Sequence, residues 1–344
     1  GGVGQVICLT PCGGADEPHF VFERVRRRTA TGLRYFIEEL RYAWSVGERV
    51  RAFQPDVIIV SSDFPIYFIQ LLPRNAPKIV SLHNTFWQPY GKPSGMKGIM
   101  IEFLRKIALR ETNFAVCVSK ECQRQFNYLR LNNYIFSTIQ IPRLRERFKA
   151  SDKPVPKRLI YVGRIEVDKG VSDLIHAFHR ISPRVPGISL KIVGDGSALD
   201  DCRELVERLE LDRAVEFTGR LDADGVGRAY AESDLCVCPT RWTFNEGLAT
   251  VPLEAASYGV PTIMSEAVPA KEQFGGGSLV FEPGDVEDLA QKLFDAGTVS
   301  DVYRGSCCDA RESFRRTMRD TGDWKAGVYA CLRRLTIPLE AESE

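Results

Sequence analysis

The sequence predicts an α/β protein with two doubly wound domains, each built on a parallel sheet. Its 344 residues fit about two domains, and hydrophobic residues make up 44% of the chain, which is enough for two cores. Short apolar runs alternate with helical patterns in both halves, which favours parallel strands joined by helices. The polar, proline-bearing stretch Lys149–Lys157 has the composition of a linker. We therefore expect domains at residues 1–148 and 158–320.

The first half shows a βαβ rhythm. Strand patterns lie at Val6–Thr10, Asp56–Ser61, Lys78–Leu82 and Phe114–Ser119. Helical patterns lie at Leu33–Phe53, Lys92–Arg110 and Gln123–Leu129. A doubly wound domain normally opens with a strand, a glycine loop and a helix, whereas here Gly1–Gly4 stands directly before the first strand pattern. The sequence therefore predicts a first domain that lacks its opening strand and helix.

The segment Lys92–Arg110 combines apolar residues at helical spacing with five basic residues. This pattern fits a helix that lies in a membrane interface. It fits equally well an ordinary amphipathic helix whose basic face is in water. Both interpretations stay open from the sequence.

The second half repeats the alternation with a longer series of strands. Strand patterns lie at Arg158–Val162, Ser189–Val193, Val215–Thr218, Leu235–Cys238, Pro261–Met264 and Ser278–Phe281. Helical patterns separate these strands, and a further one covers Trp324–Leu335. Such alternation predicts a parallel sheet with helices on both faces.

Composition argues against several classes of protein. The apolar neighbourhood Val57–Leu72 is interrupted by Asp63 and Pro65 and is too short to span a bilayer. No secretory signal pattern opens the chain. The ten cysteines form no C-x-x-C pair and no Cys/His cluster with zinc spacing. We interpret them as reduced thiols of a cytoplasmic protein.

Charge is divided unevenly between the two halves, although the net charge is only +1. Residues 1–150 contain 22 Lys and Arg against 12 Asp and Glu, a difference of +10, and the remainder contains 24 against 33, a difference of −9. The first half therefore predicts an anionic partner.

Glu246 and Glu254 stand eight positions apart within Pro239–Pro261, between a strand pattern and a helical one. This places Glu246 at the mouth of the helix and Glu254 two turns in, a span of about 12 Å at 1.5 Å per residue. The span matches the reach from the sugar to the ribose of a nucleotide diphosphate sugar, and the helix N-terminus between them suits a diphosphate. In open α/β sheets, ligands bind beyond the carboxyl ends of the strands. The alternative is that both glutamates are solvated surface residues.

Basic residues and glycines follow the strands of the second half. Gly163 and Arg164 come directly after its first strand pattern, and Lys169 precedes the next helix. Arg and Lys side chains both donate well to phosphate oxygens. Gly194–Gly196 forms a tight turn after the following strand, where the backbone can approach a ligand. Each signal is weak alone, because loop Arg and Lys residues are usually solvated.

In combination, these motifs resemble the group-1 glycosyltransferases, glycosyltransferase family 4. The motifs that carry the resemblance are GR at 163–164, KG at 169–170, GDG at 194–196, the E-x7-E pair at 246 and 254, and EPGD at 282–285. Weaker matches are QPDVIIV at 54–60, SLHNT at 81–85 and VSK at 118–120. The resemblance implies two Rossmann-like domains facing each other across a cleft, the GT-B fold. It also implies a C-terminal helix, within 321–344, that crosses back to the first domain.

The resemblance also implies an activity, the transfer of a hexose-type sugar from a UDP- or GDP-sugar with retention at the anomeric carbon. Arg164 and Lys169 would hold the donor diphosphate, and Glu246 would contact the transferred sugar. Glu254 would hold the ribose, and His83 would lie beside the sugar. The other donor contacts implied are Gly163, Gly194, Asp195, Gly247 and Leu248. The family often has E-G-F-G where this chain has Glu246-Gly247-Leu248-Ala249.

We expect no metal and no other cofactor. The string Asp222-Ala223-Asp224 is of a type that carries a metal in other transferases, but here it fits the start of the helix that follows the strand Val215–Thr218. The basic side chains of Arg164 and Lys169 already supply positive charge for a diphosphate.

The predicted acceptor is a glycan, a glycolipid or a lipid-linked molecule of cell-envelope polysaccharide or glycolipid biosynthesis. We expect a cytoplasmic protein at the inner face of the membrane, with peripheral contact through the basic first domain and no nucleic-acid partner. Two alternatives stay open. One is a nucleotide-sugar epimerase of the same fold, against which the E-x7-E spacing speaks. The other is a catalytically silent relative that only binds a nucleotide sugar.

Overall fold

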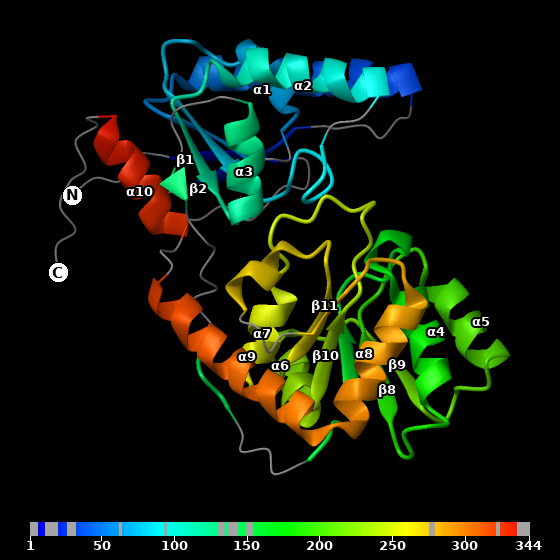
Figure 1. Cartoon of the computed structure of the whole chain (residues 1–344). Coiled ribbons are helices and arrows are strands. Elements are labelled where there is room, and N and C mark those ends of the chain that lie inside the picture. The colour runs from blue at the N-terminus through cyan, green and yellow to red at the C-terminus, as the bar shows by residue number, and fades with distance from the viewer. Residues whose placement is uncertain are drawn as a thin grey trace.

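The computed structural model describes residues 6–10, 20–25, 32–61, 64–92, 95–129, 135–136, 144–148, 154–274, 279–320 and 324–335, and every structural statement below concerns these residues. They form two α/β domains, one above the other in Figure 1. All the described strand pairs are parallel. Parallel neighbours need long crossover connections, which the helices supply. The predicted fold class is confirmed.

The first domain contains a four-stranded sheet in the order β3-β4-β5-β6. Its strands are β3 (Ile58–Ser61), β4 (Lys78–Leu82), β5 (Phe114–Cys117) and β6 (Ile135–Phe136). Two further strands, β1 (Val6–Thr10) and β2 (Phe20–Arg24), pair with each other. The sequence pattern predicts β1 but not β2.

The helices of the first domain are α1 (Gly32–Phe53), the 3-10 helix η1 (Ile66–Leu71), α2 (Gly95–Leu109) and α3 (Lys120–Tyr128). Helix α3 begins earlier than the sequence predicts because Ser119 caps it. The Ser119 hydroxyl accepts from the Cys122 amide at 3.2 Å, which satisfies one of the free amides of the first turn.

The second domain contains a six-stranded sheet in the order β12-β11-β10-β7-β8-β9. Its strands are β7 (Arg158–Val162), β8 (Ser189–Val193), β9 (Val215–Gly219), β10 (Leu235–Cys238), β11 (Thr262–Ser265) and β12 (Val280–Phe281). Every residue of β10 and β11 is buried, as expected for strands covered on both faces. Its helices include α4 (Val171–Ile181), α5 (Leu199–Arg208), α6 (Ala223–Glu232), α7 (Val251–Ser257) and α8 (Val286–Thr298).

Two further helices connect the domains. Helix α9 (Ser300–Asp320) runs along the second domain, and α10 (Trp324–Arg334) lies beside the first (Figure 1). Val328 and Cys331 of α10 are buried in one cluster with Ile79 of β4 and Val116 of β5. The chain that leaves the first domain at 144–148 also contacts the second domain, since the Arg147 amide donates to the Ser257 carbonyl at 2.7 Å.

One hydrophobic cluster extends through both domains. It includes Leu82 and Phe126 from the first domain and Leu248, Leu253 and Phe274 from the second. The domains therefore meet through a continuous apolar contact. Within the described ranges, no helix combines the length and the apolar character that crossing a membrane requires.

Candidate active site

The candidate site lies where the strand order of the second domain reverses. The chain moves outward from β7 through β8 to β9 and then returns to the other side of β7 at β10. In open α/β sheets, ligands bind in the crevice beyond the carboxyl ends of the strands at such a switch point. The loops that follow β7, β8 and β10 carry most of the residues predicted from the sequence.

The loops after β7 and β8 are joined backbone to backbone. The Gly163 amide donates to the Val193 carbonyl at 3.0 Å, and the Ile165 amide donates to the Asp195 carbonyl at 2.9 Å. The Tyr161 hydroxyl donates to the Arg164 carbonyl at 2.6 Å. These hydrogen bonds hold the predicted GR and GDG motifs side by side.

Lys169 lies at the end of β10 because the backbone of the next residue, Gly170, packs closely against the backbone of Pro239. It ends the 3-10 helix η2 (Val167–Lys169), and Gly170, with φ of 69°, starts α4. A Cβ on Gly170 would overlap the Pro239 carbonyl, and L side chains rarely adopt such a φ. Glycine therefore lets the Lys169 turn lie directly against the residue that follows β10.

Arg241 fixes the loop 239–250. Its guanidinium donates two hydrogen bonds to the Asp173 carboxylate of α4, at 2.7 and 2.5 Å, and its amide donates to the Asp168 carbonyl at 2.9 Å. An Arg–carboxylate pair with two parallel bonds fixes orientation as well as distance. The loop that carries Glu246 is therefore tied to the loop that carries Lys169.

Lys169 and Glu246 meet at the centre of the site. The Lys169 ammonium lies 2.6 Å from Glu246 Oε2, and the two side chains are 15% and 11% exposed. The Lys169 Nζ also lies 3.7 Å from the centroid of the Phe244 ring, and the Arg164 Cζ lies 5.5 Å from the same centroid. The structure therefore brings the predicted residues Arg164 and Lys169 to one aromatic ring and pairs Lys169 with the predicted Glu246.

The thiol of Cys238, at the end of β10, lies close enough to this ion pair for both charges to act on its pKa. Burial raises the pKa of Cys238 to about 11, the Glu246 carboxylate adds to the rise, and the Lys169 ammonium opposes it. A thiol with such a pKa is protonated at neutral pH and is a poor nucleophile. The charged chemistry of the site therefore belongs to the lysine, the arginine and the carboxylate.

Glu254 belongs to a different set of contacts. Its Oε1 accepts from the Thr250 hydroxyl at 3.2 Å, and its Oε2 accepts from the Tyr230 hydroxyl of α6 at 3.4 Å. The expectation that two helical turns separate Glu246 from Glu254 is wrong, because α7 begins only at Val251 and Glu254 lies in its first turn. Pro252 is favoured at such a helix start, and the residues before it form the loop.

The two domains touch at Gly247. A Cβ there would overlap the His83 carbonyl oxygen at the end of β4, so only glycine fits this contact without movement. The Cys122 thiol of α3 also approaches the Gly247 carbonyl, with 3.9 Å between sulfur and oxygen. The residue next to Glu246 is thus packed against the backbone of His83.

The side chain of His83 contacts its own domain. Its Nε2 lies 2.9 Å from the Ser81 hydroxyl oxygen, and the Trp324 indole of α10 donates to that same oxygen at 2.8 Å. Sequence reasoning places His83 in the site, and the structure places its backbone at the domain contact and its ring beside Ser81.

Asp195 and Leu248 complete the predicted set. The Asp195 carboxylate accepts from the Gly196 amide at 2.9 Å and lies 3.5 Å from Arg220, at an exposed position. Leu248 is buried in the hydrophobic cluster that both domains share. Leu248 therefore fixes the loop beside Glu246 through packing.

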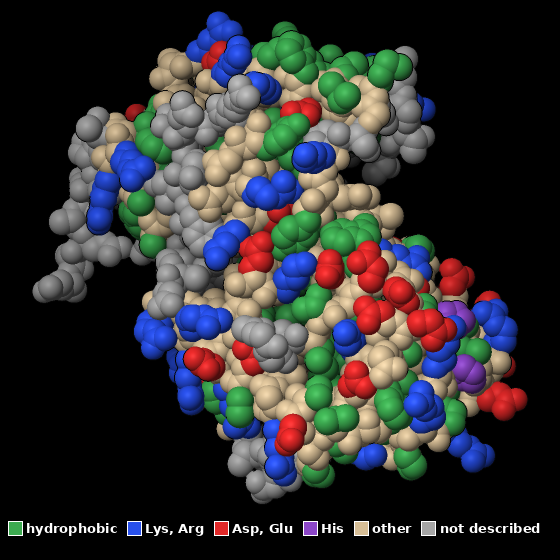
Figure 2. All heavy atoms as spheres, in the orientation of Figure 1, with side chains coloured by type: hydrophobic (Ala, Val, Ile, Leu, Met, Phe, Trp, Pro, Cys, Tyr) green, Lys and Arg blue, Asp and Glu red, His purple; other side chains and the backbone are tan. Residues whose placement is uncertain are grey.

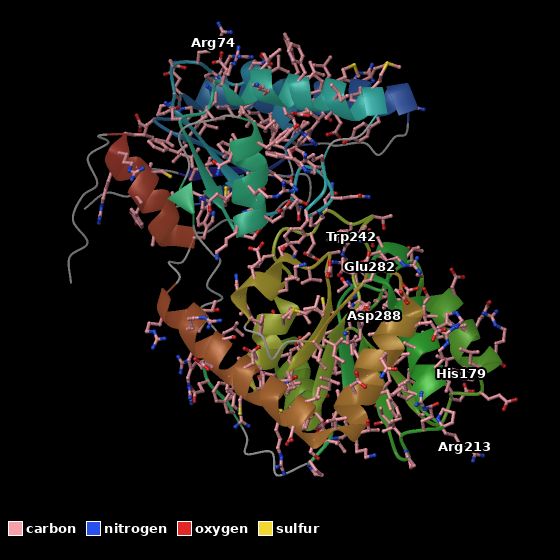
Figure 3. The ribbon with its side chains drawn as sticks, viewed as in Figure 1. Arg74, His179, Arg213, Trp242, Glu282 and Asp288 are labelled. Atoms are coloured by element: carbon pink, nitrogen blue, oxygen red, sulfur yellow. The ribbon has the colours of Figure 1, made fainter. Side chains whose placement is uncertain are left out.

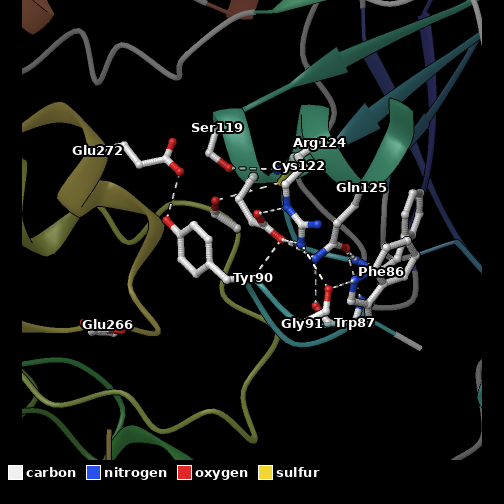
Figure 4. Close-up of polar contacts among 12 residues, drawn as sticks. Phe86, Trp87, Tyr90, Gly91, Ser119, Cys122, Arg124, Gln125, Glu266 and Glu272 are labelled. Carbon is white, nitrogen blue, oxygen red and sulfur yellow. Dashed lines mark hydrogen bonds and ion pairs between the residues drawn. The ribbon is translucent and has the colours of Figure 1, made fainter. Parts of the chain in front are cut away.

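The loop between β4 and α2 forms the first domain's side of the contact. The Gln125 carboxamide of α3 accepts from the Phe86 amide at 2.7 Å and donates to the Trp87 carbonyl at 3.1 Å (Figure 4). The buried Glu121 carboxylate accepts from the Tyr90 amide at 2.9 Å. These bonds give the loop one conformation, with Tyr90 at a φ of 60°.

Tyr90 reaches across to the second domain. Its hydroxyl donates at 2.9 Å to Oε1 of Glu272, which lies in the 3-10 helix η3 (Pro269–Gln273) (Figure 4). The Lys271 Nζ lies 4.3 Å from the centroid of the Tyr90 ring. Burial raises the pKa of Glu272 and lowers the pKa of Lys271 from their ordinary values. This polar bridge supplements the backbone contact at Gly247.

Two predicted motifs have structural roles. Asp222 caps α6, because its carboxylate accepts from the Gly225 amide at 2.7 Å, and Asp285 of the EPGD motif caps α8 by accepting from the Glu287 and Asp288 amides. Across the described residues, no three His, Cys, Asp or Glu side chains gather in a way that could hold a metal ion.

Two family models match the chain. The model for glycosyl transferases group 1 matches residues 142–296, and the model for Glycosyltransferase Family 4 matches residues 4–133. The chain belongs to the group-1 glycosyltransferases. In this group-1 glycosyltransferase, the first match covers the site loops of the second domain and the second match covers most of the first domain.

Curated relatives match the group-1 glycosyltransferase over part of their length. A sulfoquinovosyl transferase of Arabidopsis thaliana is 33% identical over 177 residues, which are 48% of this chain and 32% of the relative. A glycogen synthase of Mycobacterium tuberculosis is 36% identical over 187 residues, 52% of this chain and 44% of the relative. The chain therefore spans less than half of the length of these relatives.

Solved structures show the same architecture. The sucrose-phosphate synthase of Thermosynechococcus elongatus superimposes with a TM-score of 0.71, at 17% identity, over 95% of this chain and 86% of its own. The group-1 glycosyltransferase thus has the GT-B fold that its sequence motifs imply.

Three residues of the site escape sequence reasoning. Phe244 faces both Arg164 and Lys169, Arg241 anchors the loop, and Tyr230 bonds Glu254. Phe244 and Arg241 do lie in the stretch that the two glutamates single out. Nothing in the local pattern distinguishes them from solvated loop residues, and Tyr230 lies in an ordinary helical pattern.

Proposed function

We propose that this group-1 glycosyltransferase moves a hexose-type sugar from a UDP- or GDP-sugar to a glycan, glycolipid or lipid-linked acceptor, with retention at the anomeric carbon. The donor diphosphate lies at Arg164 and Lys169, the transferred sugar at Glu246 and the ribose at Glu254. His83 lies beside the sugar. The backbone of the adjoining loops, at Gly163, Gly194, Asp195, Gly247 and Leu248, shapes the pocket.

The ion pair between Lys169 and Glu246 carries the proposal. A cation and a carboxylate that are distant in the sequence meet at 2.6 Å, at the sheet's switch point, with little exposure. A diphosphate sugar needs positive charge at its phosphates and a hydrogen-bond acceptor at its sugar hydroxyls, side by side. When the donor binds, its diphosphate becomes the partner of Lys169, and Glu246 turns to the sugar.

The chemistry follows from the charge at the leaving group. As the bond between the anomeric carbon and the diphosphate oxygen breaks, negative charge grows on the diphosphate, where Arg164 and Lys169 stabilise it. The acceptor oxygen attacks the same face of the sugar, and its proton passes to the departing phosphate oxygen. Contact between the domains at Gly247 excludes water and favours transfer over hydrolysis. This scheme needs no divalent metal, because Arg164 and Lys169 supply the positive charge at the diphosphate that a metal would supply.

The class of acceptor is inferred from the charge of the first half of the chain and from the relatives. The first domain, on the acceptor side, lies in the half of the chain with ten more basic than acidic residues, which suits an anionic acceptor or a surface that presents one. A sulfoquinovosyl transferase and a glycogen synthase are among the relatives. We propose an acceptor of cell-envelope polysaccharide or glycolipid biosynthesis, used on the cytoplasmic face of the membrane.

Calorimetry with bare UDP and GDP, followed by turnover of UDP-glucose and GDP-mannose with and without EDTA, tests the proposal. Lys169→Met removes the cation at nearly constant length, and a charged hydrogen bond is worth about 1.5–3 kcal/mol, so the affinity of the preferred nucleotide should fall about ten- to a hundredfold. Lys191→Met is the matched control, because Lys191 lies on β8, outside the loops of the site, and pairs there with Glu216 of β9 and Glu232 of α6.

Three outcomes contradict parts of the proposal. If neither nucleotide binds, or Lys169→Met binds as tightly as the wild type, the donor site is misplaced. If the nucleotide sugar binds but is never turned over with glycan or lipid acceptors, the chain is a silent binding relative. If EDTA abolishes transfer and manganese restores it, the metal-free scheme is wrong.

A further inference from the structure

Helices α1 and α2 form the outer layer of the first domain, on the side away from the second domain (Figure 1). The 3-10 helix η1 contacts both helices. Buried residues such as Tyr42 and Val46 of α1 and Leu109 of α2 pack inward into the shared core. The opposite faces of the two helices are exposed.

The exposed face of α2 is apolar. Met96 is 91% exposed, Phe103 62% and Ile99 60%. Two basic residues of the helix are less exposed, since Arg105 and Lys106 are half-buried and Arg105 donates to the Phe86 carbonyl at 2.9 Å. This arrangement favours the interfacial interpretation of the segment, because an ordinary amphipathic helix in water would bury its apolar side chains.

Helix α1 continues the same surface. Ile37, Leu40 and Trp44 are spaced three and four residues apart, which places them on one side of the helix, and they are 45%, 42% and 55% exposed. We call the outward surface of both helices the α1–α2 face, defined by Ile37, Leu40, Trp44, Met96, Ile99 and Phe103. Figure 2 shows hydrophobic side chains along this upper edge of the first domain. Exposed apolar surface of this kind is typical of an interaction site.

The charges beside the α1–α2 face are mostly basic. On α1, Arg34 is exposed, and the exposed Arg41 pairs with the buried Glu38 at 2.9 Å. Arg110, directly after α2 and seven positions beyond Phe103, is also exposed. Arg74 projects from the same end of the domain, with a side chain that is 77% exposed and lies 3.8 Å from Glu111 (Figure 3). An apolar strip with arginines at its margin complements a partner whose interior is apolar and whose outer layer is negatively charged.

We propose that the α1–α2 face binds the surface of a bilayer that contains anionic lipids. Met96, Ile99 and Phe103 enter the boundary between head groups and acyl chains, and Arg34, Arg74 and Arg110 contact the lipid phosphates. The charge pattern favours this occupant over a second copy of the chain, because facing copies would bring arginines toward arginines. The proposal does not depend on the donor site.

Sedimentation with vesicles tests the proposal on the full chain. The protein is mixed with vesicles of phosphatidylcholine alone and with vesicles in which about a quarter of the lipid is phosphatidylserine. We expect at least about tenfold stronger binding to the phosphatidylserine vesicles at low salt, and a loss of that preference at high salt, because the Debye length shortens.

Two pairs of substitutions separate the apolar and basic contributions. Ile99→Gln with Phe103→Gln keeps good helix formers at exposed positions and should lower vesicle binding at least about tenfold. Arg34→Gln with Arg110→Gln should lower binding to phosphatidylserine vesicles about tenfold and leave the weak binding to phosphatidylcholine unchanged. The matched controls are Leu221→Gln with Val299→Gln, and Arg203→Gln with Arg213→Gln, at exposed positions of the second domain.

Thermal melts and nucleotide binding of all variants should equal those of the wild type, which shows that folding and the donor site are intact. The proposal is overturned if wild-type protein ignores both kinds of vesicle, or if the Gln variants and the controls bind alike. It is also overturned if analytical ultracentrifugation shows a dimer that Ile99→Gln with Phe103→Gln dissociates, because a second copy then covers the face.

Discussion

The two domains hold their functional loops in different ways. In the second domain, the loops after β7, β8 and β10 are tied to one another by backbone hydrogen bonds, by the Arg241–Asp173 pair and by the close approach at Gly170. In the first domain, the loop after β4 is held by side chains of α3, chiefly Gln125 and Glu121. Backbone contacts leave less freedom than side-chain contacts do.

This difference assigns different tasks to the domains. Catalytic charges need positions fixed to within fractions of an ångström, and in the proposed function the second domain would supply them on its interlocked loops. The first domain contacts the site at Gly247. In the proposed function it also faces the acceptor. We therefore expect the largest functional effects from substitutions in the second domain, and effects on domain contact from substitutions in the first.

The largest effect should come from substituting Glu246 and Glu254 of the second domain one at a time. If Glu246 contacts the transferred sugar as proposed, Glu246→Gln removes a negative charge that would stabilise the positive charge growing on the sugar ring. A charged hydrogen bond is worth about 1.5–3 kcal/mol, so kcat should fall about ten- to a hundredfold with little change in nucleotide affinity. Steady-state kinetics beside calorimetry with the bare nucleoside diphosphate measures both quantities.

Glu254→Gln is the matched comparison, at a carboxylate that Thr250 and Tyr230 hold away from the ion pair. If Glu254 binds the ribose, the substitution should weaken nucleotide and donor alike, because ribose contacts serve the ground state and the transition state equally. The opposite pattern, in which Glu246→Gln loses the nucleotide and Glu254→Gln keeps it, would reverse the orientation of the donor.

The second domain is also the part of the fold that the sequence predicts best. Strands β7, β8 and β10 have the bounds that the sequence predicts, because buried parallel strands are continuous apolar runs bounded by glycine, proline or charge. In the first domain, β2 is missed, since Phe20–Arg24 mixes apolar and charged residues and resembles no buried strand. Other expectations, such as the opening glycines Gly1–Gly4, lie outside the described residues.

Some features of the site could not be predicted from the sequence. Motif order places Arg164, Lys169 and Glu246 in one pocket, but the direct pairing of Lys169 with Glu246 depends on how two loops pack. The start of α7 at Val251 is missed because apolar residues such as Leu248 extend the helical pattern into the loop. The exposure of Met96 and Phe103 also depends on tertiary packing, since an amphipathic pattern does not say which face turns outward.

An intermediate effect should come from the contact between the domains. Gly247→Ala places a Cβ against the His83 carbonyl, so the loop or the domain must move. Overpacking of this kind costs about 1–3 kcal/mol, and part of it should appear as weaker domain contact. We expect a lower denaturation midpoint, slower transfer and a larger radius of gyration in small-angle scattering.

The control for Gly247→Ala is Gly305→Ala, in helix α9, where a Cβ would meet no atom within 4 Å. This substitution should be neutral or stabilise the protein by up to about 1 kcal/mol, because alanine favours a helix interior. A Gly247→Ala variant with unchanged activity and dimensions would show that the domains do not stay in contact at this point during turnover.

The smallest effect should come from the polar bridge between Tyr90 and Glu272, and it should depend on pH. Burial raises the pKa of Glu272 above its ordinary value of 4.5, while the Tyr90 hydroxyl opposes the rise by donating to the carboxylate. A folded-state pKa above the unfolded value means that, at a pH between the two values, the folded protein binds more protons than the unfolded protein. The free energy of unfolding therefore falls as pH rises from 4.5 through the raised pKa.

Tyr90→Phe removes the hydrogen bond that favours the charged carboxylate, so the pKa of Glu272 should rise further. The pH range over which the free energy of unfolding falls should therefore become wider. The variant should lose about 0.5–1.5 kcal/mol of stability at neutral pH and less below pH 4.5, where Glu272 is protonated in both states. Denaturant unfolding of Tyr90→Phe, Glu272→Gln and the double variant, each across this range of pH, measures the coupling. In the Glu272→Gln background nothing titrates at this position, so the effect of Tyr90→Phe should become independent of pH. A loss that is the same at every pH in the wild-type background would mean that Tyr90 joins the domains through packing against Lys271 and not through its bond to Glu272.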